Sequence, residues 1–321
     1  MNGRSQDPII SVRGLAKSFD GLPAIRSLDL EVRADQMFGL IGPDGGGKTT
    51  LLRILCGLVI PDAGDVQVLG FDSVRDQDRI KDDIGYMPQR FSLYPDLTVA
   101  ENLRFFADIY SVPRAEREQR TERLMEFSRL APFARRRAGA LSGGMKQKLA
   151  LSCTLIHTPR LLILDEPTTG VDPVSRGEFW EILAELRRQG VTILVTTPYM
   201  DEAARCDCAA LMYQGQILTR GTPDQITGQC PHKLIRVYTP KAQVAAQILK
   251  ESSQYSSVEL YGDRVHVAAL DLKRDLKSVE QTLQQANIPF SSMEEAEPEL
   301  EDTFVYLVTH RNENDGLSHS R

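Results

Sequence analysis

The feature that most restricts the fold of this chain is a glycine-rich segment between an apolar run and a helical pattern. It reads Gly42-Pro-Asp-Gly-Gly-Gly-Lys48-Thr49, follows the apolar residues 37–41 and precedes leucines at helical spacing over residues 51–58. Glycines let backbone N–H groups converge on phosphate oxygens, and the start of a helix adds positive potential. A glycine turn without a ligand is the alternative, but the bare pattern should arise by chance in roughly one such chain in a hundred. We therefore predict a phosphate-binding loop between a buried strand and a helix.

Two side chains at the end of this loop are suited to nucleotide chemistry. Lys48 is expected to reach the β and γ phosphates, and Thr49 to offer its hydroxyl to Mg²⁺. The residues of this segment that we predict to bind the nucleotide are Gly42, Pro43, Asp44, Gly45, Gly46, Gly47, Lys48, Thr49 and Thr50.

A pair of carboxylates follows another apolar run, at residues 161–164. Asp165 and Glu166 stand at the end of this predicted buried strand, where ionised groups are costly unless something compensates them. We expect Asp165 to hold Mg²⁺ through water, and Glu166 to orient or deprotonate the water that attacks the γ-phosphate. Such a pair alone is equally typical of an exposed cap, so its meaning depends on the phosphate-binding loop upstream.

The composition is that of an ordinary folded protein with room for two domains. In 321 residues, hydrophobic side chains make up 41% and charged side chains 26%. The length favours a main domain of roughly 200 residues with a smaller one beside it in the sequence. The net charge of -6 argues against a dedicated nucleic-acid binder, which would carry a strongly basic face.

The cysteines favour a reducing, cytosolic location. The five are odd in number and scattered, without the spacing of a disulfide framework. Cys206 and Cys208 form a C-x-C pair that could ligate a metal, but no second pair or histidine lies near them. We therefore interpret both as small buried or half-buried residues.

No segment of the sequence is predicted to span a membrane. The most apolar stretch, residues 51–60, contains Arg53 and is about half as long as a membrane-crossing helix. Residues 1–8 are polar without an apolar centre, so we expect a flexible tail there and not a secretory signal. A role at a membrane would therefore require docking onto a protein that spans it.

The larger part of the chain is predicted to be α/β. Residues 9–12 and 24–32 alternate like half-buried strands, so an antiparallel sheet opens the fold. Near-continuous apolar runs, typical of parallel strands buried on both faces, occupy residues 37–41, 161–164 and 191–196. Helical patterns lie between these runs. Residues 97–140 are rich in Arg and Glu around spaced apolar residues, which indicates a mostly helical insertion with a solvated charged face.

A turn-rich segment, residues 221–231, precedes a smaller C-terminal region. The pattern there is strand, helix, strand, strand, helix, strand, over residues 234–238, 244–249, 258–261, 265–269, 272–283 and 288–290. This βαββαβ order predicts a ferredoxin-like α+β domain. An acidic run at residues 294–302 then precedes an apolar helix at residues 304–308, where we prefer helix capping over cation binding.

One further segment carries a specific resemblance. Leu141-Ser-Gly-Gly-Met-Lys-Gln147 opens an amphipathic helix, and in isolation it would be a glycine-rich turn with a serine cap. Placed one helix ahead of the Asp-Glu strand, it resembles the signature sequence of the ATP-binding cassette (ABC) family. The resemblance implies that Ser142, Gly143 and Gly144 contact the γ-phosphate of ATP held by a second cassette, in agreement with anion binding at a helix start. One chain alone would then not complete the site.

Further motifs of the family follow in the same order. Gln89, in Tyr86-Met-Pro-Gln89, resembles the Q-loop residue that senses Mg²⁺ and contacts the membrane subunit, and Asp172 resembles the D-loop aspartate. Phe19 resembles the aromatic residue that stacks on adenine. Seen alone, Asp172 could equally be a helix cap, and Phe19 would more often be a core residue. The resemblance implies ATP and Mg²⁺ as cofactors, with metal contacts from Thr49, Gln89 and Asp165 and catalytic roles for Glu166, Lys48 and Gln89.

The resemblance covers residues 9–228 almost without a gap. It implies a P-loop NTPase fold with a central parallel sheet, an N-terminal antiparallel sheet and a helical insertion. Residues 86–110 and the segment Pro298-Glu-Leu-Glu-Asp-Thr-Phe are most similar to the drug and polymer exporter branch. The predicted divisions are a tail at 1–8, the cassette at 9–228 with its helical part at about 91–140, an accessory domain at 232–310 and a disordered tail at 311–321.

One position departs from the family pattern. The strand at residues 191–196 should be followed by a histidine that binds the γ-phosphate, but the sequence reads Thr196-Thr-Pro198. Pro198 has neither a side-chain nor a backbone proton to donate. Slower hydrolysis driven by Glu166 alone, a degenerate cassette whose partner supplies the working site, and a deliberate substitution are the open explanations. Because losing one transition-state contact costs about 3 kcal/mol, we expect reduced hydrolysis with ATP binding intact.

The expected function is ATP hydrolysis that powers a membrane exporter through nucleotide-driven dimerisation of two cassettes, as a homodimer or a heterodimer. The protein would lie in the cytoplasm on the inner face of the cell membrane, held there by transmembrane permease subunits, with no nucleic-acid partner. Phe91, Leu93 and Tyr94 cluster as apolar anchors for the permease, in a groove between the Gln89 loop and the helical insertion. Ordinary exposed apolar residues are the alternative.

Two other functions remain open at this point. A soluble, non-transport cassette protein would usually carry two cassettes or a long coiled-coil insertion, and neither pattern is present in this sequence. A regulatory module that binds ATP with little hydrolysis is kept open by Pro198.

Overall fold

The structure is a computed structural model that describes residues 7–90, 93–252, 254–255 and 257–318. It separates the chain into two units, residues 1–223 and 224–321, and each is described by itself. The boundary lies shortly before the predicted end of the cassette at residue 228 and falls at the short helix α8 (Pro223–Thr227). Most of the tail predicted at residues 1–8 lies outside the described residues.

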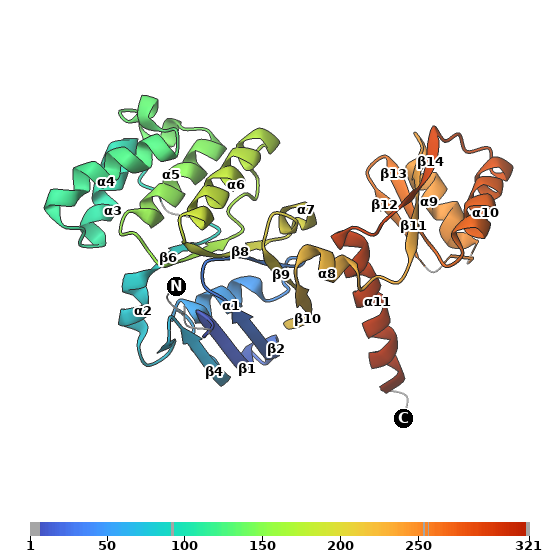
Figure 1. Cartoon of the computed structure of the whole chain (residues 1–321), viewed down its shortest axis with the longest axis horizontal. Coiled ribbons are helices and arrows are strands. Elements are labelled where there is room, and N and C mark those ends of the chain that lie inside the picture. The colour runs from blue at the N-terminus through green and yellow to red at the C-terminus, as the bar shows by residue number, and fades with distance from the viewer. Residues whose placement is uncertain (1–6, 91–92, 253, 256, 319–321) are drawn as a thin grey trace, which may run out of the picture. The chain divides into compact units, whose positions relative to one another are not determined.

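A six-stranded sheet forms the centre of the first unit (Figure 1). Its strand order is β10-β9-β3-β8-β7-β6, and all neighbours run parallel except β10, which pairs antiparallel with β9. The strands are β3 (Met37–Ile41), β6 (Ile84–Met87), β7 (Leu161–Asp165), β8 (Thr192–Thr197), β9 (Cys208–Tyr213) and β10 (Gln216–Gly221). The predicted central parallel sheet is therefore confirmed through β3, β7 and β8, whereas β6 and β9 were not predicted.

The sheet separates two hydrophobic cores because its central strands are apolar at consecutive positions. Side chains alternate between the faces of a strand, so Leu161 and Ile163 of β7 contribute to one core and Leu162 and Leu164 to the other. Helix α1 (Lys48–Leu55) packs into the first core, and helices α5 (Gly143–Leu155) and α6 (Pro173–Arg188) pack into the second. Residues at the carboxyl ends of the parallel strands consequently meet at one edge of the sheet.

An antiparallel sheet covers the other side of α1. Its order is β2-β1-β4-β5, formed by β1 (Ile10–Phe19), β2 (Leu22–Val32), β4 (Ala63–Val68) and β5 (Phe71–Asp72). The inward side chains of β1 and β2, such as Ile10, Leu15 and Leu28, join the same core as α1. This arrangement confirms the predicted N-terminal antiparallel sheet.

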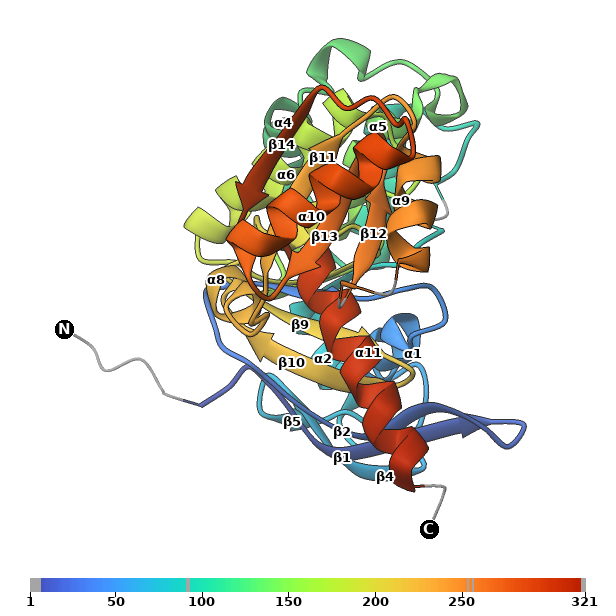
Figure 2. The same cartoon turned by 90° about the vertical axis from the view of Figure 1, so that its right-hand side faces the viewer.

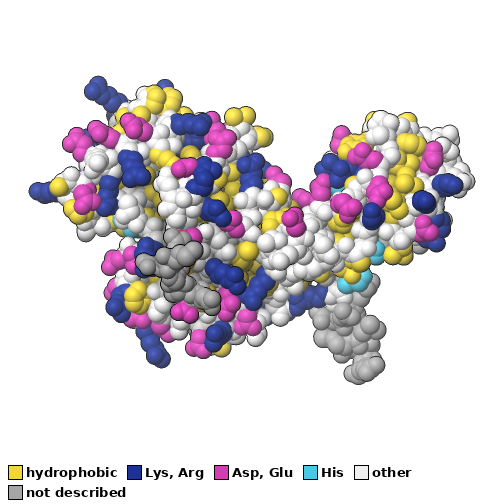
Figure 3. All heavy atoms as spheres, viewed as in Figure 1, with side chains coloured by type: hydrophobic (Ala, Val, Ile, Leu, Met, Phe, Trp, Pro, Cys, Tyr) yellow, Lys and Arg dark blue, Asp and Glu magenta, His cyan; other side chains and the backbone are white. Residues whose placement is uncertain are grey.

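The predicted helical insertion is also present. It contains α3 (Val99–Ile109), α4 (Arg114–Phe127) and two short 3₁₀ helices, Ala131–Phe133 and Ala138–Ala140; α2 (Gln77–Asp83) precedes it. Thr98 and Glu101 form a reciprocal capping box at the start of α3, which satisfies backbone N–H groups that a helix start leaves unpaired. In the view of Figure 3, basic and acidic side chains are interspersed over the visible surface of the first unit.

The second unit is a four-stranded antiparallel sheet with two helices, α9 and α10, on one face (Figure 2). Its strand order is β12-β13-β11-β14, which is the ferredoxin-like arrangement predicted from the βαββαβ pattern. Its elements are β11 (Lys233–Tyr238), α9 (Ala242–Glu251), β12 (Val258–Tyr261), β13 (Arg264–Ala269), α10 (Leu272–Gln285), β14 (Ser292–Ala296) and α11 (Leu300–Ser318). Apolar side chains of α9 and α10 fill the space against the sheet.

Two details of this unit correct the sequence prediction. The last strand was expected at residues 288–290, but β14 begins at Ser292, and Ile288 is buried in the core ahead of the strand. In the pairing of β14 with β11, Glu294 lies opposite Arg236, and their charged groups are 3.7 Å apart. Helix α11 continues to Ser318, past residue 311, where the sequence was expected to become a disordered tail.

In the part of the chain that the structure describes, no helix combines the length and the apolar character needed to cross a bilayer.

Candidate active site

The phosphate-binding loop connects β3 to α1, and two of its glycines have no room for a side chain. A Cβ atom on Gly42 would lie 2.0 Å from the carbonyl oxygen of Met212, and one on Gly47 would lie 2.5 Å from that of Ala24. Gly47 also has a φ of 101°, in the left-handed region that glycine favours. Strands β9 and β2 therefore approach the loop so closely that only glycine fits at both positions.

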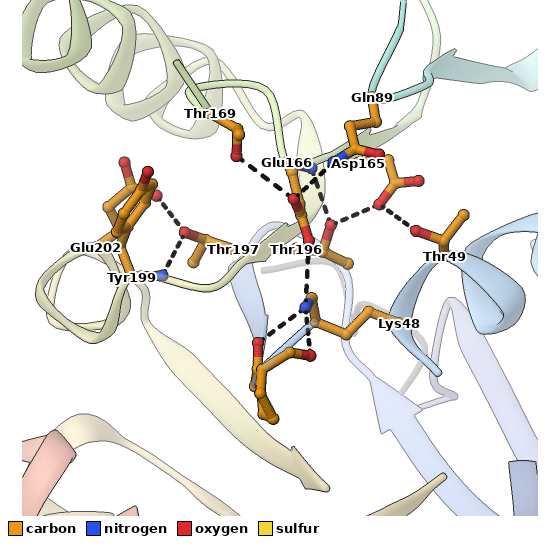
Figure 4. A network of polar contacts seen from close by, with 12 residues as sticks. Lys48, Thr49, Gln89, Asp165, Glu166, Thr169, Thr196, Thr197, Tyr199 and Glu202 are labelled. Atoms are coloured by element: carbon orange, nitrogen blue, oxygen red, sulfur yellow. Dashed lines mark hydrogen bonds and ion pairs between the residues drawn. The ribbon is translucent and has the colours of Figure 1, made fainter. Parts of the chain in front are cut away.

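Lys48 is the first residue of α1, and its ammonium is almost fully buried. Its Nζ donates hydrogen bonds to the carbonyl oxygens of Gly42, at 2.8 Å, and Pro43, at 3.0 Å. The same atom lies 3.2 Å from Glu166 Oε1, so the lysine joins the loop to the end of β7 (Figure 4). Such a buried ammonium, held by weak carbonyl acceptors, is suited to exchange them for phosphate oxygens.

A cleft of about 260 Å³ opens beside this lysine. It is lined by Ala24, Asp44, Gly45, Gly46, Gly47, Lys48, Thr49, Thr50, Gln89 and Glu166. The structure thus brings most of the predicted loop together with Gln89 and Glu166, although these come from distant parts of the sequence. Gly42 and Pro43 contribute through the carbonyl groups that hold Lys48. A glycine-rich backbone, a helix start and a cation fit the phosphates of a nucleotide.

Asp165 ends β7 between two hydroxyl groups. Its Oδ1 accepts hydrogen bonds from Thr49 Oγ1 at 3.1 Å and from Thr196 Oγ1 at 2.9 Å. Burial raises the pKa of this carboxyl above its ordinary value. A hydroxyl and a carboxylate are oxygen ligands of the kind that Mg²⁺ prefers. Among the described residues, there is no group of three or more His, Cys, Asp or Glu side chains that could hold a metal ion.

Glu166 follows with an unusual backbone conformation. Its φ is 49°, and its N–H donates to Thr196 Oγ1 at 2.9 Å. The carboxylate accepts hydrogen bonds on Oε2 from Gln89 Nε2, at 2.9 Å, and Thr169 Oγ1, at 3.4 Å, while Oε1 pairs with Lys48. Left-handed backbone at a residue other than glycine persists where the surroundings hold it, and it is frequent in active sites. The base predicted from the sequence is therefore held at the edge of the cleft.

The signature segment lies apart from the cleft of its own chain. Ser142 caps α5, its Oγ accepting from Met145 N–H at 3.3 Å, and both Ser142 and Gly143 are exposed. Gly144 is buried, and a Cβ atom there would lie 2.4 Å from Ser175 Oγ on α6. None of the three predicted signature residues is among those that line the cleft beside the phosphate-binding loop. Within one chain, the structure does not bring them to the phosphates.

Asp172 and Phe19 also lie outside the residues that line this cleft. Asp172 caps α6, its Oδ1 accepting from Ser175 N–H at 2.9 Å, and this hydrogen bond lowers the pKa of its carboxyl. The helix-cap interpretation of Asp172 is therefore correct for the single chain. Phe19 ends β1 and is 47% exposed, and Lys17 Nζ lies 5.3 Å from the centre of its ring. Their contacts with nucleotide stay predictions.

Thr196 was not predicted to belong to the site, although its hydroxyl contacts both acidic residues. Its position at the end of a predicted buried strand is the sequence feature that could have identified it. Thr196 ends an apolar run on β8, the neighbour of β7, so it emerges at the same edge of the sheet as Asp165. Ala24 lines the cleft too, but its proximity depends on tertiary packing and has no local signal.

The parallel sheet, the glycine loop with Lys48 after β3, and the carboxylates at the end of β7 define a P-loop nucleotide-binding domain. Residues 25–169 match the family described as ABC transporter. The chain is 36% identical to the Nod factor export ATP-binding protein I of Ralstonia nicotianae over 95% of its own length and 95% of that protein's. The chain belongs to the ABC transporter family, as an ATP-binding cassette of its ATPases.

Other relatives are named as export or resistance proteins. The chain is 41% identical, over 94% of its length, to the probable multidrug ABC transporter ATP-binding protein YbhF of Escherichia coli. It spans 52%, about half, of that protein's length. It is also 32% identical, over 94% of its length, to the daunorubicin resistance ATP-binding protein DrrA3 of Streptomyces coeruleorubidus, of which it covers 96%.

Solved structures support the same fold. One described as the ATP-binding subunit of an ABC transporter has a TM-score of 0.62 and 30% identity, over 69% of this chain and 92% of that one. CbiO1 of Clostridium perfringens, described as part of the complex cbiONQ, has a TM-score of 0.65 and 25% identity, over 70% of this chain and 92% of that one. The predicted P-loop NTPase fold is confirmed.

Proposed function

We propose that this chain is the ATP-hydrolysing subunit of a membrane exporter. The observation that carries the proposal is the convergence of Lys48, Gln89 and Glu166 on one cleft bounded by the phosphate-binding loop. The names of relatives as multidrug, Nod factor export and daunorubicin resistance proteins favour export over other uses of a cassette. What is exported would be decided largely by the membrane-spanning partners.

The roles of the residues follow from their positions. Lys48 would neutralise the β and γ phosphates by exchanging its carbonyl acceptors for phosphate oxygens. Thr49 and Asp165, whose side chains are hydrogen-bonded to each other, would hold Mg²⁺, which when bound would neutralise charge on the phosphates. Glu166 would orient and deprotonate the attacking water, because its carboxylate faces the cleft and Gln89 fixes its direction.

A dimer of cassettes would complete the site. Ser142 and Gly143 form an exposed helix start that does not reach the cleft of its own chain, so a second copy or a related cassette is the natural source of the missing contacts. A solved cassette of the same fold is described as a dimer. The proposal includes homodimers and heterodimers, and ATP would join the two cassettes reversibly.

Membrane-spanning permease subunits are the proposed partners, which would place the cassette on the inner face of the cell membrane. A groove of about 410 Å³ lies between the segment of Gln89 and the helical region, with Leu93 and Pro95 among its lining residues. Tyr94 is 45% exposed, and its ring contacts Phe105 at 4.4 Å between centroids. Phe91, the third predicted anchor, lies outside the described residues. An apolar side chain of a permease helix could dock here.

The proposal is tested by hydrolysis and binding in the same preparations. We expect the parent chain to hydrolyse Mg-ATP, Glu166→Gln to bind ATP but lose at least about a hundredfold in kcat, and Lys48→Ala to lose ATP binding. Lys81→Ala and Glu185→Gln are matched controls, since both side chains lie on exposed helix surfaces. ATP binding without turnover in the parent would favour the regulatory module instead. Unchanged binding in Lys48→Ala would reject the site.

A further inference from the structure

A buried carboxylate joins three segments that surround the site. Glu202, on the short helix α7 (Met200–Ala203), is 1% exposed. Its Oε1 accepts a hydrogen bond from Thr168 Oγ1 at 2.7 Å, and its Oε2 accepts one from Thr197 Oγ1. Arg176 Nε lies 3.7 Å from Oε1. Because a buried charge is costly unless it is paired and hydrogen-bonded, these contacts hold all four side chains in one arrangement.

Each partner of Glu202 belongs to a segment next to the chemistry. Thr168 is in the turn that follows Glu166, and that turn is closed by a hydrogen bond from Thr169 N–H to the Glu166 carbonyl. Thr197 is the last residue of β8, directly after the threonine that holds Asp165. Figure 4 shows Glu202 and Thr197 on one side of Glu166, with Lys48 and Gln89 on its other sides.

The turn after β8 is closed by side chains where the family histidine is missing. Pro198 lacks an N–H group, and the next one along, that of Tyr199, donates to Thr197 Oγ1 at 3.0 Å. The ring of Tyr199 lies 4.3 Å from the guanidinium carbon of Arg176, the same arginine that faces Glu202. The hydroxyl of Thr197 therefore serves two contacts at once, one to Tyr199 and one to Glu202.

We propose that Glu202 is a positioning residue for hydrolysis. By binding Thr168 and Thr197 together, it fixes the turn after Glu166 against the end of β8, so the catalytic carboxylate is held in its left-handed conformation and directed at the cleft. Its carboxylate touches neither nucleotide-binding residues nor Glu166 itself among the contacts described. This inference rests on the proposed ATPase function.

The test separates positioning from simple stability by comparing kcat with KM. Thr168→Val keeps the shape of the side chain and removes one donor to Glu202, and Glu202→Gln keeps a hydrogen-bonding group but removes the charge that faces Arg176. We expect each to lower kcat by about tenfold, with the KM for ATP within about twofold of the parent, because a misdirected catalytic group affects the reaction more than binding. Thr168→Ser, which restores the hydroxyl, should recover most of the rate. Asp201→Asn is the matched control, since Asp201 is an exposed carboxylate on the same helix.

The outcomes distinguish this inference from the proposed function. A parent chain without turnover would reject the function, and the positioning role with it. An active parent with unchanged kcat in folded Thr168→Val and Glu202→Gln would overturn the positioning role alone. A raised KM with unchanged kcat would overturn it as well, because Glu202 would then support binding. Failure of Thr168→Ser to recover the rate would also count against it.

Discussion

Thr196 donates a hydrogen bond from its hydroxyl to Asp165 Oδ1 over 2.9 Å. The hydroxyl oxygen of Thr196 also accepts a hydrogen bond from the backbone N–H of Glu166, at 2.9 Å. One side chain of β8 therefore orients both acidic residues at the end of β7. The residue proposed for the metal and the residue proposed as the base are thus linked through a single atom.

The first prediction concerns this hydroxyl. Thr196→Val preserves the shape of the side chain but leaves Asp165 with one donor fewer in a buried position. We expect kcat for ATP to fall by about tenfold and the free energy of unfolding by about 1–2 kcal/mol. Steady-state kinetics and urea unfolding would measure the two effects. Thr196→Ser, which keeps the hydroxyl, should resemble the parent; equal losses in both variants would show that the methyl group matters instead.

The second prediction follows from the raised pKa of Asp165. A carboxyl whose folded-state pKa is raised contributes stability below its ordinary pKa, and this contribution is lost as pH rises through the folded value. Asp165→Asn should therefore leave the nucleotide-free protein equally stable or more stable at pH 7, while Mg²⁺-dependent hydrolysis is abolished. The stability difference between variant and parent should shrink as pH approaches about 4.

Asp62 serves as a control, because the pKa of its carboxyl is shifted in the opposite direction to that of Asp165. A hydrogen bond from Lys17 lowers the pKa of the Asp62 carboxyl, so its contribution to stability is present above the ordinary pKa and is lost as pH falls through the lowered value. Asp62→Asn should destabilise the protein slightly at pH 7, and the difference should fade in acid. Urea unfolding of both variants at two pH values gives the comparison. Parallel behaviour of the two would contradict the assignment for Asp165.

The third prediction uses two adjacent glycines with different surroundings. A Cβ atom at Gly143 would meet nothing within 4 Å, whereas one at Gly144 would lie 2.4 Å from Ser175 Oγ. Gly143→Asp should fold normally but lose ATP-dependent dimerisation and hydrolysis, because it places a negative charge where a partner's phosphate is expected. Gly144→Ala should lower the melting temperature by forcing α5 away from α6. Light scattering with and without ATP, and thermal unfolding, would separate the two; normal dimers of Gly143→Asp would reject the proposed interface.

The fourth prediction concerns the missing histidine. Pro198→His restores a side-chain donor after β8, and we expect kcat to rise by about tenfold or more with little change in the KM for ATP. Pro198→Ala is the control, since it restores the backbone N–H without adding a ring. A gain in Pro198→His alone would assign the effect to the imidazole. Equal rates in all three proteins would show that Pro198 does not limit turnover.

The loop and the carboxylates could be predicted because each is a local motif beside an apolar run. Each motif consists of consecutive residues, Gly42 to Thr50 in the loop and Asp165 with Glu166 after β7, so it can be recognised in the sequence alone. Parallel strands then place such residues at one edge of a sheet. The ferredoxin-like order was predicted for the same reason, since alternation and helical spacing are local signals.

The features of the fold and the site that could not be predicted depend on contacts between residues far apart in the sequence. Glu202 contacts Thr168 on another segment, and no local pattern in the sequence indicates that contact. Thr196 has only a weak signal, its place at the end of an apolar run, and its partner Asp165 lies on the neighbouring strand. The position of β14 was missed because its pairing with β11, in which Glu294 lies opposite Arg236, becomes visible only in the folded sheet.

The carbonyl groups of Gly42 and Pro43 have a consequence for the turnover cycle. When ADP and phosphate depart, the ammonium of Lys48 does not remain stranded without acceptors, because the loop's own backbone and the carboxylate of Glu166 receive it. A buried ammonium without acceptors would make product release costly in free energy, because nothing would compensate the loss of its hydration. The backbone of the loop and Glu166 therefore give Lys48 a set of acceptors that does not depend on a bound phosphate.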